Sequence, residues 1–156
     1  MKILMLTWEY PPRIVGGIAR VVHDLSKRLI KDGHEVTVVT YKEGDLPDYE
    51  NDKGVKVYRV NNYMINPNNF IDWIMQLNFN LVAKATEIIQ KEGPFDVIHA
   101  HDWLVAYAAK TLKMHLIFLL WLRFMQQRLV EILVYMMKHK DILMIQNGCL
   151  LMKQQK

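Results

Sequence analysis

Residues 2–40 read KILMLTWEYPPRIVGGIARVVHDLSKRLIKDGHEVTVVT, and this stretch decides the fold. An apolar strand at Lys2–Thr7 leads through a loop with Gly16 and Gly17 into an amphipathic helix, and a β-branched strand follows at Glu35–Thr40. The free N–H groups of a helix N-terminus attract anions, and glycine lets a phosphate or a sugar come close. This order of elements therefore indicates an enzyme that acts on a nucleotide or a nucleotide sugar.

The same alternation continues along the chain. The first helix is predicted to end at Asp32-Gly33, and the polar stretches 44–54 and 61–69 are predicted to be loops. Two further strands are predicted at Val55–Val60 and Phe95–Ala100, and two further helices at Phe70–Glu92 and Trp103–Leu112. Strands that alternate with helices favour right-handed crossovers, so we predict an α/β fold with a Rossmann-like parallel sheet flanked by helices. Ligands of such sheets bind beyond the carboxyl ends of the strands, where two of the loops, 8–17 and 99–103, would lie.

The composition limits the class of protein. The chain has 156 residues, of which 51% are hydrophobic and 23% charged, and these values are typical of one globular domain. The net charge of +4 comes without a dense Lys/Arg stripe among aromatic residues, so no nucleic-acid partner is expected. The single cysteine, Cys149, rules out an internal disulfide. The N-terminus lacks a signal-peptide pattern and the apolar run Leu116–Leu122 is too short for a bilayer, so we expect a cytoplasmic protein without stable membrane insertion.

The first loop carries several candidate ligand-binding residues. Gly16 and Gly17 belong to neither a dinucleotide fingerprint nor a P-loop, so they indicate either an anion site or an ordinary turn. Arg13 and Arg20 flank the glycine pair and can meet phosphate charge, although Arg20 fits a solvated helix face equally well. Glu9 and Tyr10 offer hydrogen-bonding groups to sugar hydroxyls, or have no role beyond the loop.

The second group of candidates lies in DVIHAHDW, residues 96–103, where a buried strand ends. His99, His101 and Asp102 offer no distant fourth ligand, so no metal site is expected. A neutral imidazole can instead hydrogen-bond a sugar hydroxyl, and Asp102 can orient it or accept a proton. One of the two histidines, His99 in our interpretation, is expected to be structural and satisfied by the backbone.

Two segments together resemble a known family. LTWEYPPRIVGGIARVVHDLSKRLIKDGHEVTVVT (6–40) and FDVIHAHDWLVAYAAK (95–110) resemble the N-terminal domain of retaining GT-B glycosyltransferases of families 4 and 5, with glycogen and starch synthases nearest. The resemblance covers residues 1 to about 113. It implies two Rossmann-like domains facing across a cleft, with the N-terminal domain on the acceptor side and most of the nucleotide-sugar donor on the C-terminal domain. It also implies that the partners are a nucleotide-sugar donor and a glycan acceptor, with no cofactor beyond the ADP- or UDP-sugar substrate.

The resemblance assigns roles residue by residue. Gly16 and Gly17 match the glycine loop that approaches the donor phosphates and sugar, and His101 matches the histidine of a His-Asp-Trp motif that contacts the transferred sugar. Bacterial family 5 synthases carry a lysine two residues before the glycine pair, where this chain has Ile14, so Arg13 is the candidate substitute and the donor nucleotide stays open. The family's C-terminal domain has no counterpart here, so we expect a truncated chain that is inactive alone.

The sequence changes character at residue 114. The family continues with a strand and a motif resembling A-T-I-H-A-T-E-x-G-R-x-x-G-I-Y. Suitable synonymous codons for Trp121–Tyr135, read from the third base, translate as A-T-I-H-A-T-E-A-G-R-N-S-G-I. We therefore predict a domain at 1–113 and a frame-shifted tail without function at 114–156. The alternative is a terminal amphipathic helix, with its apolar stripe at Met125, Leu129, Ile132, Leu133 and Met136.

The expected function is transfer of a sugar, glucose by resemblance, from a nucleotide-sugar donor to a glycan acceptor. Two alternatives remain open. One is a stand-alone nucleotide- or sugar-binding Rossmann module completed by a partner chain that carries a separate C-terminal half. The other is a fragment of a sugar epimerase with GT-B architecture.

Overall fold

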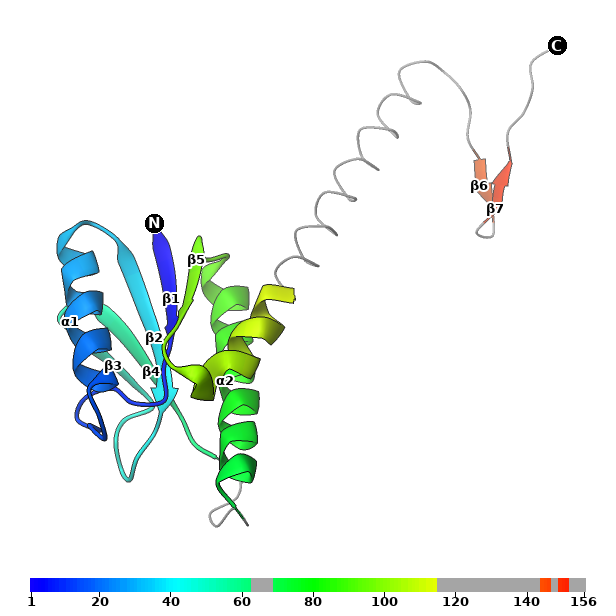
Figure 1. The fold of residues 1–156 in the computed structure, drawn as a ribbon. Helices are drawn as coiled ribbons and strands as arrows, with labels where there is room; N and C mark the ends of the chain where they lie inside the picture. The colour runs from blue at the N-terminus through cyan, green and yellow to red at the C-terminus, as the bar shows by residue number, and fades with distance from the viewer. Residues whose placement is uncertain (63–68, 115–143, 147–148, 152–156) are drawn as a thin grey trace. The chain divides into compact units, whose positions relative to one another are not determined.

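The computed structural model describes residues 1–62, 69–114, 144–146 and 149–151. The chain divides into two compact units, Met1–Met114 and His115–Lys156, which are described separately (Figure 1). The elements of the first unit are β1 (Lys2–Leu6), α1 (Ile18–Lys31), β2 (Glu35–Tyr41), β3 (Tyr49–Asp52), β4 (Val55–Val60), α2 (Phe70–Glu92) and β5 (Val97–Ala100). A 3₁₀ turn at Trp103–Val105 then leads into helix over residues 106–114.

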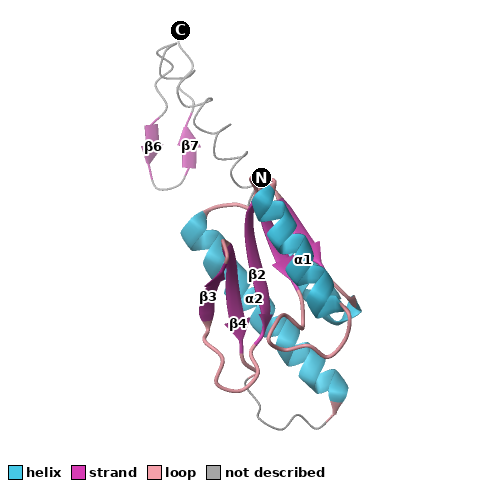
Figure 2. Cartoon of the chain, turned by 90° about the vertical axis from the view of Figure 1, so that its left-hand side faces the viewer, coloured by secondary structure: helices cyan, strands magenta, loops and turns pink. Residues whose placement is uncertain are grey.

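The first unit is built on one five-stranded sheet with the order β3-β4-β2-β1-β5. The pairs β1/β2, β1/β5 and β2/β4 are parallel, and only β3 runs antiparallel to its neighbour β4. Helix α1 covers one face of the sheet and α2 the other (Figures 1 and 2). The predicted α/β fold with a Rossmann-like sheet is therefore confirmed.

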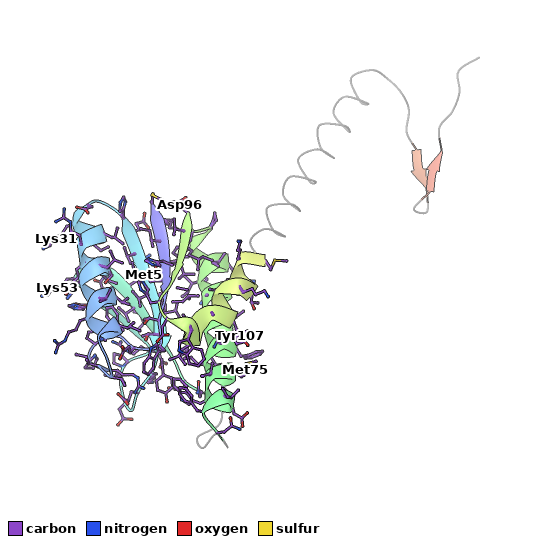
Figure 3. All side chains as sticks on the ribbon, in the orientation of Figure 1. Met5, Lys31, Lys53, Met75, Asp96 and Tyr107 are labelled. Atoms are coloured by element: carbon purple, nitrogen blue, oxygen red, sulfur yellow. The ribbon has the colours of Figure 1, made fainter. Side chains whose placement is uncertain are left out.

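The central strands β1 and β2 are largely buried and rich in apolar residues because both faces of the sheet are covered there. One core lies between the sheet and α1, where the buried side chains are Ile3, Met5, Tyr10, Val22, Val36, Val38, Val55 and Val57. The alternate strand positions, such as Leu4 and Leu6, are also fully buried, because α2 turns Ile74, Leu77 and Leu81 toward the opposite face. By contrast, Met75 and Tyr107 lie on the outer side of the helices and are exposed (Figure 3).

Strand β3 was not predicted, because its residues were assigned to a loop spanning 44–54. It forms a hairpin with β4 through the two-residue turn Lys53-Gly54, whose φ angles are 53° and 99°. Left-handed conformations at both central residues are what a tight hairpin turn needs, and glycine adopts them without strain. The side chain of Asn51 accepts a hydrogen bond from the N–H of Gly54 at 2.7 Å and so closes the turn.

The remaining boundaries agree closely with the prediction. Helix α2 has the predicted limits: Asn69 caps its N-terminus by accepting from the N–H of Asp72, and Gly93 ends it with a φ of 86°. Strand β5 begins at Val97 rather than at Phe95. No helix among the described residues is long and apolar enough to cross a membrane.

In the second unit the structure describes an antiparallel pair, β6 (Met144–Gln146) and β7 (Cys149–Leu151). The alternative helix with its stripe from Met125 to Met136, and the apolar run Leu116–Leu122, lie outside the described residues. The assignment of 114–156 as a frame-shifted tail stays a prediction.

Candidate functional site

The two loops expected at the ligand-binding edge of the sheet lie side by side. Strands β1 and β5 are neighbours with Leu6 opposite Ala100, and the N–H of His101 donates to the carbonyl of Leu6 at 2.9 Å. Just beyond the strands, the indole Nε1–H of Trp8 donates to Oδ2 of Asp102 at 3.0 Å. This hydrogen bond joins the loop of the glycine pair to the turn of the His-Asp-Trp sequence.

The imidazole of His101 stands out chemically at this edge. Its Nε2 is buried and has no hydrogen-bond partner among the described residues. The ring lies against that of His99, with 4.1 Å between the centroids. Burial, with a smaller contribution from the charge of His99, lowers the pKa of His101 to about 4. His101 is therefore neutral at pH 7, and within the described part of the chain its buried Nε2 has no hydrogen-bond partner.

His99 and Asp102 differ from their predicted roles. His99 is exposed on the edge strand, whereas the sequence analysis expected a structural histidine that is satisfied by the backbone. Asp102 has a φ of 79°, a left-handed conformation that is strained for a residue other than glycine. Its carboxylate accepts from Trp8 and from the N–H of Trp103 at 2.5 Å, and in the described part of the chain no hydrogen bond joins it to His101. Asp102 therefore holds the turn that carries His101 and does not orient the imidazole directly.

Glu9 occupies the N-terminus of α1. Its carboxylate, fully buried, accepts from the N–H groups of Val15 (2.6 Å), Gly16 (2.9 Å) and Ala19 (3.2 Å). The helix has no other side-chain cap, because Gly17 stands at the N-cap position. The carboxylate of Glu9 is thus a negative charge from the chain itself in the loop where the sequence predicted a bound anion. Glu9 does not present this carboxylate to a sugar. The sequence did contain a signal for this role: Glu9 precedes a helix that has glycine, not a capping side chain, at its N-cap position.

The two glycines differ in their surroundings. A Cβ added to Gly16 would lie 3.5 Å from Oε1 of Glu9, an ordinary contact, and one added to Gly17 would meet no atom within 4 Å. Gly17 also has an ordinary helical φ of −74°. Nothing in the chain's own packing requires glycine at position 17, so the space beside it is open.

Tyr10 is buried in the core and Arg20 is exposed on α1, so they do not share one environment. Tyr10 is 1% exposed, belongs to the core beneath α1 and donates its hydroxyl to Oδ2 of Asp52 at 3.1 Å. Burial also raises the pKa of Tyr10 above its ordinary value. Arg20 is exposed on α1, as the solvated-face alternative predicted. Neither residue is carried into the functional proposal.

Arg13 lies in a cluster of aromatic residues. Its guanidinium sits over the rings of Trp8 and Tyr41, 5.5 and 5.2 Å from their centroids, and pairs with the carboxylate of Glu43. A pocket of about 540 Å³ opens here, lined by Trp8, Arg13, Tyr41, Glu43, Asn69, Phe70 and Trp73. The sequence analysis did not predict this pocket, because its aromatic residues come from separate parts of the chain and Tyr41 lay just beyond the predicted end of its strand.

The described residues contain no group of three or more His, Cys, Asp or Glu side chains that could hold a metal ion. Residues 2–118 match the family of the starch synthase catalytic domain. The chain belongs to this family. The predicted resemblance to glycogen- and starch-synthase-like glycosyltransferases is therefore confirmed.

Relatives within this family are known. An uncharacterised glycosyltransferase of Methanocaldococcus jannaschii is 45% identical over 118 residues, covering 72% of this chain and 28% of the relative. A glycogen synthase of Mycobacterium tuberculosis is 35% identical over 122 residues, covering 70% of this chain and 30% of the relative. The chain thus spans less than a third of the length of these two relatives.

Solved structures support the fold of the family. A sucrose-phosphate synthase from Thermosynechococcus elongatus is similar over 72% of this chain and 30% of its own, with a TM-score of 0.61 and 20% sequence identity. At that identity the similarity shows the fold alone, which is that of a GT-B glycosyltransferase half.

Proposed function

We propose that this chain forms the acceptor-side half of a retaining glycosyltransferase that transfers glucose from ADP- or UDP-glucose to a glycan. The observation that carries the proposal is the hydrogen bond between Trp8 and Asp102, since it holds both motif loops at one edge of the sheet. Membership of the starch synthase catalytic domain family supports the reaction class.

His101 is proposed to contact the transferred sugar. A neutral imidazole with an unpartnered Nε2 can exchange a hydrogen bond with a sugar hydroxyl, and its lowered pKa of about 4 keeps it neutral at pH 7. The open space beside Gly17 is proposed as the place where the donor approaches. No cofactor beyond the nucleotide sugar is part of the proposal.

The site needs a second half. A leaving nucleoside diphosphate must be stabilised by cations or aimed N–H groups. In the described part of this edge several of those groups are already engaged: Glu9 accepts from the N–H groups of Val15, Gly16 and Ala19, and Glu43 pairs with Arg13. The diphosphate is therefore proposed to be held by a C-terminal half, carried on a continuation of the chain or on a partner chain. The coverage of 28–30% of the relatives' length favours such a missing half.

The role of His101 is tested in a completed enzyme. Residues 1–113 are joined to the part of the Methanocaldococcus jannaschii relative that lies beyond the matched segment, and glucose transfer is measured. His101→Ala is expected to lower turnover about a hundredfold, the scale of losing one group that acts on developing charge. His99→Ala serves as the matched control, and equal losses from both variants would contradict the assignment.

A further inference from the structure

The pocket between the carboxyl ends of β1 and β2 and the start of α2 has no role in the proposal above. It is framed by four aromatic rings, three of which contact the central ring of Trp73. Trp73 meets Trp8 edge-on at 6.4 Å and Tyr41 at 5.3 Å, and it stacks on Phe70 at 5.9 Å with 6° between the planes. These contacts fix the rings before any ligand arrives, and preorganised rings lose little entropy on binding.

Phe70 forms the accessible wall of this pocket. One face of its ring is stacked on Trp73, yet the residue is 57% exposed, so most of the remaining ring surface faces solvent. An aromatic face with its negative π-electron density suits the weakly positive C–H groups on the apolar face of a sugar ring. The volume of about 540 Å³ lies within the usual range of small-ligand sites.

The polar groups around these rings carry both donors and acceptors. Arg13 supplies N–H donors, Glu43 supplies carboxylate oxygens at the rim, and Asn69 keeps its amide N–H groups because its Oδ1 accepts from Asp72. Arg13 and Glu43 neutralise each other, so the pocket has no net charge. A phosphate or a nucleoside diphosphate would meet no unpaired cation there, whereas a neutral polyhydroxyl ring finds donors, acceptors and an apolar face.

We propose that this pocket binds a neutral hexopyranose ring of the glycan acceptor. Trp8 lines the pocket and also donates to Asp102, so its indole connects the pocket to the turn that follows His101. The proposal rests on the proposed function for the identity of its ligand as an acceptor unit. It assigns a specificity role to Phe70, Trp73 and Arg13 that the motif loops do not explain.

The test uses the full chain and maltotriose as the probe. Indole N–H signals of the ¹⁵N-labelled protein are followed by NMR, and those of Trp8 and Trp73 are expected to shift saturably with a millimolar dissociation constant. Phe70→Ala and Arg13→Gln are expected to weaken binding about tenfold or more. Phe79→Ala removes another exposed phenylalanine, 66% accessible, from the same helix outside the pocket, and should leave binding unchanged.

Three results would overturn the inference: no saturable shift of Trp8 and Trp73, unchanged affinity in a folded Phe70→Ala variant, or tighter binding of ADP or glucose 6-phosphate than of maltotriose at the same signals. The experiments distinguish a failure of this inference from a failure of the proposed function. An active joined enzyme whose Phe70→Ala variant keeps the Michaelis constant for the acceptor would sink this inference and leave the proposed function intact. Binding of maltotriose together with a harmless His101→Ala would sink the role of His101 alone.

Discussion

At the scale of single residues, Glu9 shows how one carboxylate organises a ligand loop. It accepts three backbone N–H groups at the start of α1 while fully buried, and thereby fixes the loop that carries Gly16 and Gly17. A helix N-terminus stabilises a negative charge, and a buried N–H that loses its partner costs free energy. The glycine loop is thus preformed by an internal anion.

Glu9→Gln tests this role. The amide keeps one acceptor oxygen but places an N–H₂ group against backbone donors, so the free energy of unfolding is expected to fall by about 2–4 kcal/mol. Urea denaturation measures the change as a lower midpoint with an unchanged slope. Glu35→Gln, at an exposed position, is the matched control and should stay within about 0.5 kcal/mol of the parent. A Glu9→Gln protein as stable as the parent would show that the carboxylate charge is not needed there.

His101 gives a prediction about pH. Because burial lowers the pKa of His101 from its ordinary 6.5 to about 4, the unfolded chain binds a proton more readily than the folded one between these values. The stability contributed by the neutral imidazole is therefore complete above pH 6.5 and is lost as the pH falls toward 4. An NMR titration of the imidazole signals should give a midpoint for His101 near 4, and a midpoint near 6.5 would contradict the buried, unprotonated ring.

At the scale of elements, the sequence pattern predicted correctly the helix limits that are set by local capping residues. Helix α2 has its predicted ends because Asn69 caps one terminus and Gly93 stops the other. Strand β3 was missed because YEND is polar and none of its residues is buried. It forms by pairing with β4, and no alternation of apolar residues predicts that pairing. The turn residues Lys53-Gly54 were the available signal for this hairpin.

The site was predictable only in part, because contacts between distant parts of the chain also determine it. The two loops follow neighbouring parallel strands, so their meeting at the carboxyl edge could be inferred from the order of elements. Which side chains face a ligand depends on partners far apart in the chain. Glu9 accepts hydrogen bonds from backbone N–H groups beside the start of α1, and Tyr10 donates to Asp52. Trp73 contacts the rings of Trp8 and Tyr41. A single sequence without contacts does not contain that information.

At the scale of the whole molecule, the second unit tests the frame-shift hypothesis. A segment read in a shifted frame has no selected packing, and a two-stranded hairpin alone is marginally stable. Backbone amides of β6 and β7 are therefore expected to exchange with solvent much faster than those of β1 and β2. Slow, cooperative exchange of β6 and β7 at the rate of the core strands would identify an evolved element. The coding DNA beyond Lys113, read in the shifted frame, should likewise continue the family motif.

The most direct test of the central claim, that this chain supplies only the acceptor side of a divided site, is a transfer assay. The purified chain is incubated with radiolabelled ADP-glucose or UDP-glucose and glycogen, alone and joined through residues 1–113 to the remainder of the Methanocaldococcus jannaschii relative. We expect no transfer by the chain alone, because Glu9 and Glu43 already engage N–H and guanidinium groups at this edge and the chain spans less than a third of its relatives. The joined protein is expected to transfer glucose. Measurable turnover by the chain alone, or a folded joined protein that transfers no glucose, would contradict the account.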